Sequence, residues 1–505
     1  MKALISVYDK SGIADFAYRL HQMGFELVST GGTHRVIQEA NLPVNQVSEI
    51  TGSPEILGGR VKTLHPVIHG GILARRDKEE HSQELQIQGI DTIDIVIVNL
   101  YPFAETVSKP DVTLEDALEN IDIGGPTMIR AAAKNFPSVL VVVDPEDYSW
   151  VSKKIIEGTI TFEDRKNLAY KAFQHVAVYD SLISGYLQDP NNNFPDKTTL
   201  AYSKLYDLRY GENPHQKAAF YSDLSNSGIA SAQLLNGKEL SYNNILDADS
   251  AWKIVSDLDV AAVAIIKHTN TCGLACHDNQ IEAYERAFSG DPVSAFGGIV
   301  AFNRNLSTDT ALAMSKTFYE IVIAPDYDKE ALAILKKKRD LRILSLDLGK
   351  GNNEGLEVRQ VSGGVLLQTQ DTLTEYPGTW EVVTERKPNN NELTDMIFAW
   401  KAVKHIKSNA IVLVKDNMLV GMGAGQPNRI NSVHLAVKAA GDSSSGAVLA
   451  SDAFFPFPDG LEAGAAGGAT AVIQPGGSIR DKEVIEAANK LGLAMVFTGV
   501  RHFRH

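Results

Sequence analysis

The sequence is poor in cysteine, has no basic tract and contains no long apolar run. Only two cysteines, Cys272 and Cys276, occur among 505 residues, so a scaffold held together by disulfides is excluded. The formal charge of −14, without any Lys/Arg-rich stretch, argues against a general binding surface for nucleic acid or for an anionic membrane. An anionic substrate would therefore need a local basic pocket.

Apolar segments for targeting or anchoring are missing as well. Residues 1–12 hold too few apolar side chains for a signal peptide. No apolar run approaches the roughly 18 residues that span a bilayer. We therefore expect a cytoplasmic protein with no membrane partner.

The chain is longer than one hydrophobic core usually holds, which predicts two to four domains. A polar stretch without periodicity, rich in Asn, Pro and Asp, covers residues 187–199 and is typical of a domain boundary. A second polar break follows near residues 385–392. We expect one domain over residues 1–195 and another over residues 200–505.

The first part of the chain alternates apolar strands with amphipathic segments. Strands are expected at residues 2–8, 25–30, 93–103 and 138–144, a rhythm that predicts an α/β domain with a parallel sheet covered by helices. Such sheets bind ligands beyond the carboxyl ends of their strands. Farther on, two passages resemble each other, "AAVAIIKHTNTCG" and "NAIVLVKDNMLVGMGAG", and suggest two copies of one α/β unit.

A strand followed by small and hydroxyl residues opens a predicted helix at residues 28–40. Glycines let a backbone approach an oxyanion closely, while free amides and the helix N-terminus point at it. A turn followed by a helix with a Thr N-cap explains the same residues equally well. The residues concerned are Ser29, Thr30, Gly31, Gly32 and Thr33.

The segment 57–76 packs donors between two glycine pairs. A loop gains no stability from crowded cations, so this density favours recognition of an anion or a carbonyl over a solvated basic loop. The donors are Arg60, Lys62, Thr63, His65 and His69.

Further along lie residues suited to acid and base chemistry. Tyr101 ends a predicted strand, Asp122 precedes a glycine pair, and Lys134 lies on the helix that follows. Near an anion site these groups could move protons in carbonyl chemistry. Singly, each is more often a helix cap or a salt-bridge partner.

The apolar strand that begins at Ala261 ends in Lys267 and His268, which a buried strand does not tolerate unless both emerge at an edge. A neutral His can accept a proton, and an adjacent Lys can stabilise negative charge that develops on a carbonyl oxygen. An aromatic run near Asp459 could sandwich a flat heterocycle. Other candidates of this half are Arg209, Tyr210, His215, Asn409, Gln426, Arg429, Phe454 and Phe457.

A metal site is a tempting alternative at this point. His268, Cys272, Cys276 and His277 look like ligands, but the zinc-deaminase signature requires H-x-E followed by P-C-x-x-C, and neither occurs. The C-x3-C spacing is not that of a structural zinc pair either. We therefore expect no metal and two free, buried thiols.

Taken together, the motifs resemble those of the family of bifunctional purine biosynthesis proteins, which join an IMP cyclohydrolase domain to a phosphoribosylaminoimidazolecarboxamide (AICAR) formyltransferase domain. The resemblance covers the whole chain. Its motifs are STGGT (29–33), LGGRVKTLHP (57–66), NLYPF (99–103), IDIGG (121–125), LRYGENPHQ (208–216), IIKH (265–268), DPVSAFGG (291–298), SNAIVLVKD (408–416), GAGQPNRI (423–430), SDAFFPF (451–457) and RHFRH (501–505).

The resemblance implies the last two steps of IMP synthesis: formyl transfer from 10-formyltetrahydrofolate to AICAR, then ring closure. It implies an N-terminal domain with the methylglyoxal-synthase fold and a C-terminal domain of duplicated cytidine-deaminase-like α/β units without zinc. It also implies a homodimer with transferase sites at the subunit interface. Small molecules are then the expected partners, and no metal is needed for catalysis.

For the transfer step, the resemblance implies that His268 is the base and that Lys267 and Asn409 stabilise the developing oxyanion. Glu320 stands where some relatives have Asp, and the "NTCG" after His268 departs from an "NPAG"-like form, so Cys272 receives no catalytic role. The implied nucleotide contacts are Arg209, Tyr210, His215, Gln426, Arg429 and Arg501, and the implied folate contacts are Glu320, Phe454, Phe457 and Asp459.

For ring closure, the resemblance assigns Lys62 to oxyanion stabilisation and Asp122 with Tyr101 to proton transfer, with Lys134 as a fourth catalytic position. Holding both reacting groups of one substrate in a near-attack geometry should do much of the work. The implied nucleotide pocket consists of Ser6, Lys10, Ser29, Thr30, Gly31, Gly32, Thr33, Arg60 and Thr63.

Two other interpretations stay open at this stage. The N-terminal domain could be a regulatory module that binds a phosphorylated ligand, which would leave formyl transfer as the only activity. The intact group of Lys62, Tyr101, Asp122 and Lys134 argues against a pure phosphate sensor. A deaminase-like hydrolase is disfavoured by the missing zinc ligands.

Overall fold

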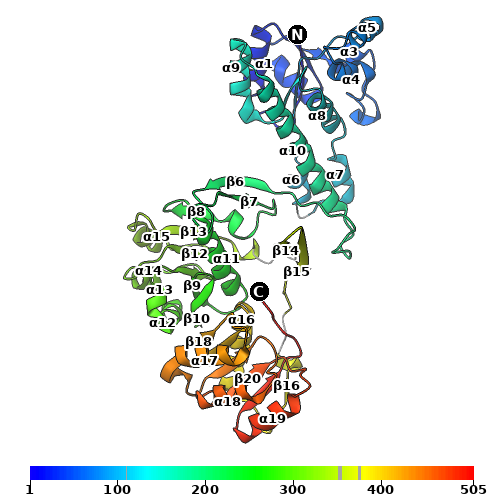
Figure 1. Cartoon of the computed structure of the whole chain (residues 1–505). Helices are drawn as coiled ribbons and strands as arrows, with labels where there is room; N and C mark the ends of the chain where they lie inside the picture. The colour runs from blue at the N-terminus through cyan, green and yellow to red at the C-terminus, as the bar shows by residue number, and fades with distance from the viewer. Residues whose placement is uncertain (110, 351–354, 374–376) are drawn as a thin grey trace. The chain divides into compact units, whose positions relative to one another are not determined.

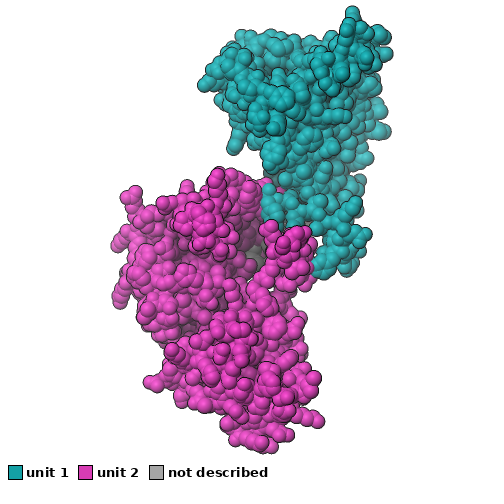
Figure 2. All heavy atoms as spheres, viewed as in Figure 1, with its two compact units in different colours: residues 1–202 teal, residues 203–505 magenta. Residues whose placement is uncertain are grey.

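The computed structural model describes residues 1–109, 111–350, 355–373 and 377–505. By their contacts these residues divide into two compact units, residues 1–202 and residues 203–505, coloured separately in Figure 2. The division falls just after the polar stretch at residues 187–199. Within the described ranges, every helix is too short or too polar to traverse a lipid bilayer.

The first unit is built on a five-stranded sheet in the order β3-β2-β1-β4-β5, with all neighbours parallel. Figure 1 labels most of the helices of this unit. The strands β4 and β5 are continuous apolar runs because helices cover both faces of the sheet; all four residues of β4 are buried. The predicted α/β class with a parallel sheet is confirmed. The strands are β1 Lys2–Ser6, β2 Glu26–Ser29, β3 Asn45–Gln46, β4 Ile95–Val98 and β5 Leu140–Val142.

The described residues of the first unit form ten α-helices. The longest, α10, runs over Phe162–Leu187 and begins with a capping box at Thr161. The others are α1 Ile13–Gln22, α2 Gly31–Glu39, α3 Val47–Thr51, α4 Pro66–Leu73, α5 Glu79–Gln88, α6 Phe103–Val107, α7 Leu114–Glu119, α8 Gly124–Lys134 and α9 Tyr148–Glu157.

The second unit is built on a twelve-stranded mixed sheet in the order β16-β21-β20-β19-β17-β18-β10-β9-β11-β12-β13-β8. Its strands are β8 Gln233–Asn236, β9 Ala262–Lys267, β10 Asn270–Cys276, β11 Ile299–Phe302, β12 Ile321–Ala324, β13 Arg342–Ser345, β16 Glu381–Val382, β17 Ile411–Lys415, β18 Met418–Gly423, β19 Val448–Ser451, β20 Ala471–Gln474 and β21 Ala494–Phe497. Two small sheets pair β6 Ser203–Leu208 with β7 Ala218–Ser222, and β14 Leu356–Val361 with β15 Gly364–Thr369.

The large sheet contains one element order twice: a helix, a β-hairpin, and then three helix–strand steps. The first copy is α11 Tyr242–Ser256, β9, β10, α12 Gln280–Gly290, β11, α14 Thr308–Met314, β12, α15 Lys329–Lys336 and β13, with the short α13 Pro292–Ala295 inserted. The second is α16 Asn390–Lys404, β17, β18, α17 Arg429–Ala440, β19, α18 Pro458–Ala466, β20, α19 Asp481–Lys490 and β21.

The two copies meet at β10 and β18 and run outward from there in opposite directions. The repeat suspected from the two similar strand passages is therefore visible in the element order. The likeness of each copy to a cytidine deaminase stays a prediction.

A glycine occupies the same place in both hairpins and explains how closely a helix packs on each. A Cβ added at Gly273 in β10 would lie 1.9 Å from the carbonyl oxygen of Ala287 in α12. One added at Gly421 in β18 would lie 2.2 Å from the carbonyl oxygen of Ala436 in α17. The backbone of each helix thus packs directly against the backbone of its strand, which only glycine permits.

We expect Gly273→Ala to lower the free energy of unfolding of the second unit by about 3 kcal/mol, because backbone atoms cannot move aside as a flexible side chain can. Denaturant unfolding followed by circular dichroism measures this change. Gly378→Ala is the control, since nothing lies within 4 Å of a Cβ there and φ is not positive. Equal stability of the two variants would contradict the close packing.

Candidate active sites

In the first unit, the carboxyl ends of β1 and β2 bring hydroxyl groups together. Ser6 Oγ lies 3.0 Å from Thr30 Oγ1. Ser29 is fully buried and donates to the carbonyl of Ile5 at 2.7 Å. Thr33 donates to the carbonyl of Val7 at 2.9 Å and accepts its N–H at 3.1 Å. The hydroxyls of Ser29 and Thr33 are therefore used in hydrogen bonds to the backbone at the end of β1. Those of Ser6 and Thr30 lie at the carboxyl edge of the sheet.

Two lysines lie against the glycine pair that opens α2. A Cβ added at Gly31 would lie 3.5 Å from Lys62 Nζ, and one added at Gly32 would lie 3.5 Å from Lys10 Cε. Lys62 Nζ pairs with Glu55 Oε2 at 3.3 Å. Two ammonium groups beside the free N–H groups of a helix N-terminus form a site suited to a phosphate.

The start of α8 joins this group through the loop that carries Lys62. Gly124 has no room for a Cβ, which would lie 2.7 Å from Thr63 Oγ1. Asp122 Oδ1 accepts the N–H of Gly125 at 2.8 Å. Burial raises the pKa of the Asp122 carboxyl, and these backbone hydrogen bonds only partly oppose the shift. A carboxyl group with a raised pKa beside an anion site is suited to proton transfer.

Tyr179 of α10 fixes the backbone at Asp122. Its hydroxyl accepts the N–H of Asp122 at 2.7 Å and donates to the carbonyl of Asn120 at 3.1 Å. Burial raises the pKa of Tyr179 to about 12, so this hydroxyl stays protonated. The sequence pointed to no such role, because Tyr179 lies 57 residues away on a helix whose pattern only indicates a core face.

Three residues predicted for this site lie at its margin or away from it. Tyr101 is 41% exposed, and its ring contacts that of Tyr8 edge-on with 5.7 Å between centroids. Arg60 forms an ion pair with Glu119 in solvent. Lys134 is the last residue of α8, and an eleven-residue helix is about 15 Å long, so Lys134 lies apart from the group at the helix start.

In the second unit, Lys267 and His268 lie at the tip of the β9–β10 hairpin, as the strand pattern predicted. Lys267 pairs with Asn270 across a two-residue turn, and His268 and Thr269 have φ values of 54° and 58°. Positive φ at both positions identifies a type I′ turn. His268 is exposed, and Lys267 Nζ donates to the carbonyl of Phe296 at 2.8 Å.

Asn409 lies at the start of β17 and is held on both sides. Its Nδ2 donates to the carbonyl of Gln426 at 2.8 Å, and its Oδ1 accepts from Arg429 at 2.7 Å. Arg429 is buried and forms an ion pair with the fully buried Asp452. The guanidinium of Arg429 thus binds Asp452 and Asn409, and it orients the Asn409 side chain.

Strand directions place these residues at one edge of the large sheet. β9 ends at Lys267, and β17 begins two residues after Asn409. Between them lie only β10 and β18. Three strand spacings of about 4.8 Å make the lateral separation about 14 Å. One edge therefore carries the hairpin tip and Asn409 as two neighbouring groups.

The predicted folate contacts lie at the same edge. Phe454 and Phe457 follow β19 and are 37% and 47% exposed, and the guanidinium of Arg480 lies 4.6 Å from the ring centroid of Phe457. Asp459, in the first turn of α18, accepts the N–H of Gly460 at 2.7 Å. Glu320, just before β12, accepts from Arg342 at 2.8 Å.

The loop between β6 and β7 carries three predicted nucleotide contacts, Arg209, Tyr210 and His215. The Arg209 guanidinium lies 5.6 Å from the ring centroid of Tyr210. Asn243 of α11 donates to the carbonyl of Glu212 at 3.4 Å, so the loop lies beside the first turn of that helix. The last nucleotide candidate, Arg501, lies over the ring of Phe503 at 4.7 Å.

Both cysteines are free, as expected. Burial raises the pKa of Cys272 to about 11 and that of Cys276 to about 12, so neither thiol ionises near neutral pH. Among the described residues, no group of three or more His, Cys, Asp or Glu side chains could hold a metal ion.

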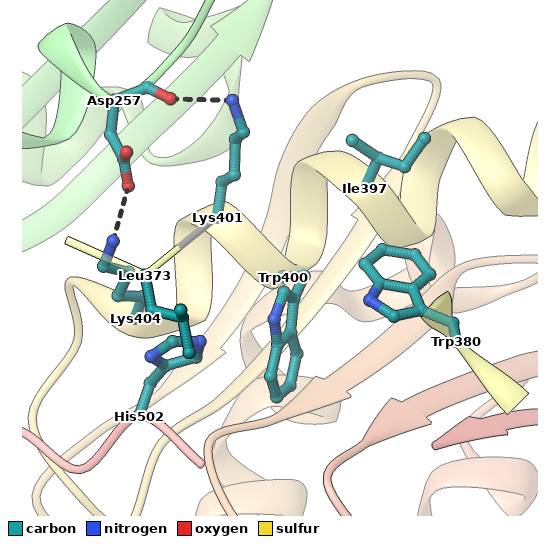
Figure 3. Close-up of a pocket in the computed structure, with 8 residues that line it drawn as sticks. All are labelled: Asp257, Leu373, Trp380, Ile397, Trp400, Lys401, Lys404 and His502. Carbon is teal, nitrogen blue, oxygen red and sulfur yellow. Dashed lines mark hydrogen bonds and ion pairs between the residues drawn. The ribbon is translucent and has the colours of Figure 1, made fainter. Parts of the chain in front are cut away.

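A small cavity of about 20 Å³ lies beside α16, with Trp380 and Trp400 in its wall (Figure 3). It has room for one water molecule and not for a substrate. Asp257, at the end of α11, binds Lys401 through its carbonyl oxygen at 2.9 Å and lies 3.4 Å from Lys404. These contacts join the first helix of one copy to the first helix of the other, so the role of this cluster is structural.

Comparisons with known proteins agree with this arrangement. The model of the AICARFT/IMPCHase bienzyme family matches residues 132–439, and that of the MGS-like domain matches residues 12–127. A "Bifunctional purine biosynthesis protein PurH" from Thermoanaerobacter sp. is 54% identical over 100% of this chain and 99% of its own length. Proteins of the same description from Caldicellulosiruptor saccharolyticus and Dictyostelium discoideum are 53% and 51% identical, with 100% of this chain and 99% and 100% of their own lengths covered.

Proposed function

The chain belongs to the AICARFT/IMPCHase bienzyme family and is a bifunctional AICAR formyltransferase and IMP cyclohydrolase; we propose that residues 203–505 perform the transfer and residues 1–202 the ring closure. The observation that supports this division is that each unit brings several of its own predicted polar residues to one edge of its sheet: Ser6, Lys10, Thr30 and Lys62 in the first, and Lys267, His268 and Asn409 in the second. The alternative of a transferase with a purely regulatory N-terminal unit has no observation in its favour.

In the transfer step, His268 takes a proton from the 5-amino group of AICAR as that nitrogen attacks the formyl carbon of 10-formyltetrahydrofolate. Exposure of His268 at the hairpin tip supports this role, because the ring can reach a bound substrate. Lys267 stabilises the oxyanion that develops on the formyl oxygen. Asn409, about 14 Å along the same edge, helps to position the formyl donor. The bond to the folate nitrogen then breaks, and that nitrogen takes up a proton.

The remaining residues of this edge bind the two substrates. The exposed rings of Phe454 and Phe457 offer flat apolar faces to the folate pterin, with Asp459 as a partner for its polar atoms. Glu320 lies beside β12, six strand spacings from β19, so we assign it no contact with the same pterin within one subunit. The nucleotide is held by Arg209, Tyr210, His215, Gln426 and Arg501. Arg429 acts by orienting Asn409, because its own charge is already paired with Asp452.

In ring closure, Lys10 with the start of α2 holds the phosphorylated substrate, and Lys62 beside the same glycine pair stabilises the oxyanion. The carboxamide nitrogen attacks the formyl carbon, Asp122 and Tyr101 move the protons, and water leaves. Burial of Asp122 supports this role, because its raised pKa brings the carboxyl closer to the range in which it can both accept and donate. Lys134 lies at the far end of α8, so we assign it no contact within its own subunit's site.

We also propose that the protein is a homodimer. A two-stranded hairpin alone in water is marginal, yet β14 and β15 form one with Val358, Val361, Val365 and Leu366 all exposed. A second copy of the chain would cover these side chains. The cytoplasmic location expected from the sequence stays a prediction.

Incubation of the purified protein with AICAR and 10-formyltetrahydrofolate, without added metal or ATP, tests the proposed function. Mass spectrometry of the nucleotide product should show IMP. Accumulation of formyl-AICAR would contradict the role of residues 1–202, and unchanged AICAR would contradict both roles.

A further inference from the structure

The hairpin tips of the two copies have the same backbone and are held in the same way. In the first, Asp247 of α11 accepts the N–H of His268 at 3.2 Å and that of Thr269 at 2.6 Å. In the second, Asp395 of α16 accepts the N–H groups of Asp416 and Asn417 at 3.0 and 2.7 Å. One carboxylate thus clamps both central residues of each turn.

The lysine before each tip is also equivalent. Lys267 donates to the carbonyl of Phe296 at 2.8 Å, and Lys415 donates to that of Ser445 at 2.8 Å. Each acceptor lies three residues before the next strand, β11 or β19. The clamp and the lysine are therefore features of the repeated scaffold and not of one site.

The copies differ in which residues occupy the turn. Asp416 and Asn417 have φ values of 53° and 56°, and Asp and Asn adopt this left-handed region at little cost. His268 and Thr269 hold the same conformation, although a β-branched residue is a genuine outlier there. The first copy thus places one unfavourable residue, Thr269, at the tip and depends more on the Asp247 carboxylate to keep the turn in this conformation.

We propose that Asp247 is a positioning residue for formyl transfer, which sets the direction of the His268 side chain by fixing the two peptide N–H groups on either side of it. This inference rests on the proposed role of His268. The Asp247 carboxylate binds backbone N–H groups and acts on the reaction only through the turn. Besides Asp247, the charged groups near this end of the hairpin are Lys267 and Asp291, which both act on the pKa of the Cys272 thiol.

Asp247→Asn tests the proposal, because the amide keeps one acceptor oxygen but turns a donor toward the second N–H. We expect kcat for formyl transfer to fall about 10- to 100-fold, the loss that a displacement of about 1 Å causes. The KM for AICAR should stay within about twofold, since a turn that reorients only His268 leaves binding intact. Cyclisation of supplied formyl-AICAR in the other unit should not change.

Asp395→Asn is the matched control, because it makes the same change to the equivalent pair of hydrogen bonds in the second copy, where the tip carries no proposed catalytic group. Asp395 is the more buried of the two carboxylates, so this variant should lose at least as much thermal stability as Asp247→Asn while its kcat for transfer stays normal. Equal loss of transfer activity in both variants would overturn the proposal, because the effect would then be one of general stability.

A double-mutant cycle separates this inference from the proposed function. In a His268→Ala background, Asp247→Asn should lower the residual transfer rate by less than about threefold, since a positioning residue has nothing left to position. The same 10- to 100-fold loss in that background would show that Asp247 acts elsewhere and overturn the inference alone. Normal transfer by His268→Ala itself would overturn the role of His268 and the inference with it.

Discussion

His268→Ala removes formyl transfer and leaves ring closure intact. We expect kcat for the conversion of AICAR to formyl-AICAR to fall about 10²- to 10⁴-fold, the usual contribution of a positioned acid or base. The 5-amino group of AICAR is a weak nucleophile because its lone pair is delocalised, so it depends on help with its proton. The cyclisation rate of supplied formyl-AICAR should equal that of the wild type, since His268 lies in the second unit.

His277→Ala is the control for this prediction, because His277 lies at the opposite end of β10 and its Nδ1 only accepts the N–H of Asn279 at 3.0 Å. It should keep both activities. Equal loss of both activities in His268→Ala would mean that the variant has unfolded or that the assigned role is wrong, and the melting temperature distinguishes the two.

Asp122→Asn has the opposite effect on the two activities. Ring closure of supplied formyl-AICAR should slow about 10²- to 10⁴-fold, because the amide keeps the hydrogen bond from the N–H of Gly125 but can no longer accept a proton. Formyl transfer should be unchanged. Accumulation of formyl-AICAR from AICAR, measured by mass, provides the check.

The same substitution should also raise stability. Burial raises the pKa of the Asp122 carboxyl in the folded state, so its contribution to stability is present below the pKa of the unfolded chain and is lost as pH rises through the folded value. Asp122→Asn should therefore melt at a higher temperature than the wild type at pH 7, with a difference that shrinks toward pH 4. A lower melting temperature would instead assign the lost activity to unfolding.

Asp116→Asn is the matched control in the same unit. Hydrogen bonds from the side chain and backbone of Thr113 hold the pKa of the Asp116 carboxyl below its usual range. That contribution to stability is present above the pKa of the unfolded chain, so the control should melt at a slightly lower temperature at pH 7. Its ring-closure rate should stay normal.

Local sequence signals were enough to predict the sheet edges. An apolar strand that runs into a Lys and a His has to end where solvent begins, and the hairpin tip at His268 confirms it. Strands buried on both faces likewise predicted the parallel sheet of the first unit. These signals depend only on near neighbours in the chain.

Contacts between distant segments could not be predicted in this way. Asp247 binds the hairpin tip from a helix 21 and 22 residues upstream, and its own surroundings in the sequence resemble any amphipathic helix. The sequence alone predicts Arg429 as a nucleotide contact. The structure shows that its charge is already paired with the buried Asp452. Lys134 shares a motif-rich segment with Asp122, but the length of α8 separates the two.

The claim that one chain holds two separate active sites is tested most directly by mixing the two single variants. His268→Ala together with Asp122→Asn, supplied with AICAR and 10-formyltetrahydrofolate, should form IMP, because formyl-AICAR made by the second variant can be closed by the first. A variant that carries both substitutions should form none. Failure of the mixture to produce IMP, with both proteins folded and each retaining its one activity, would contradict the account.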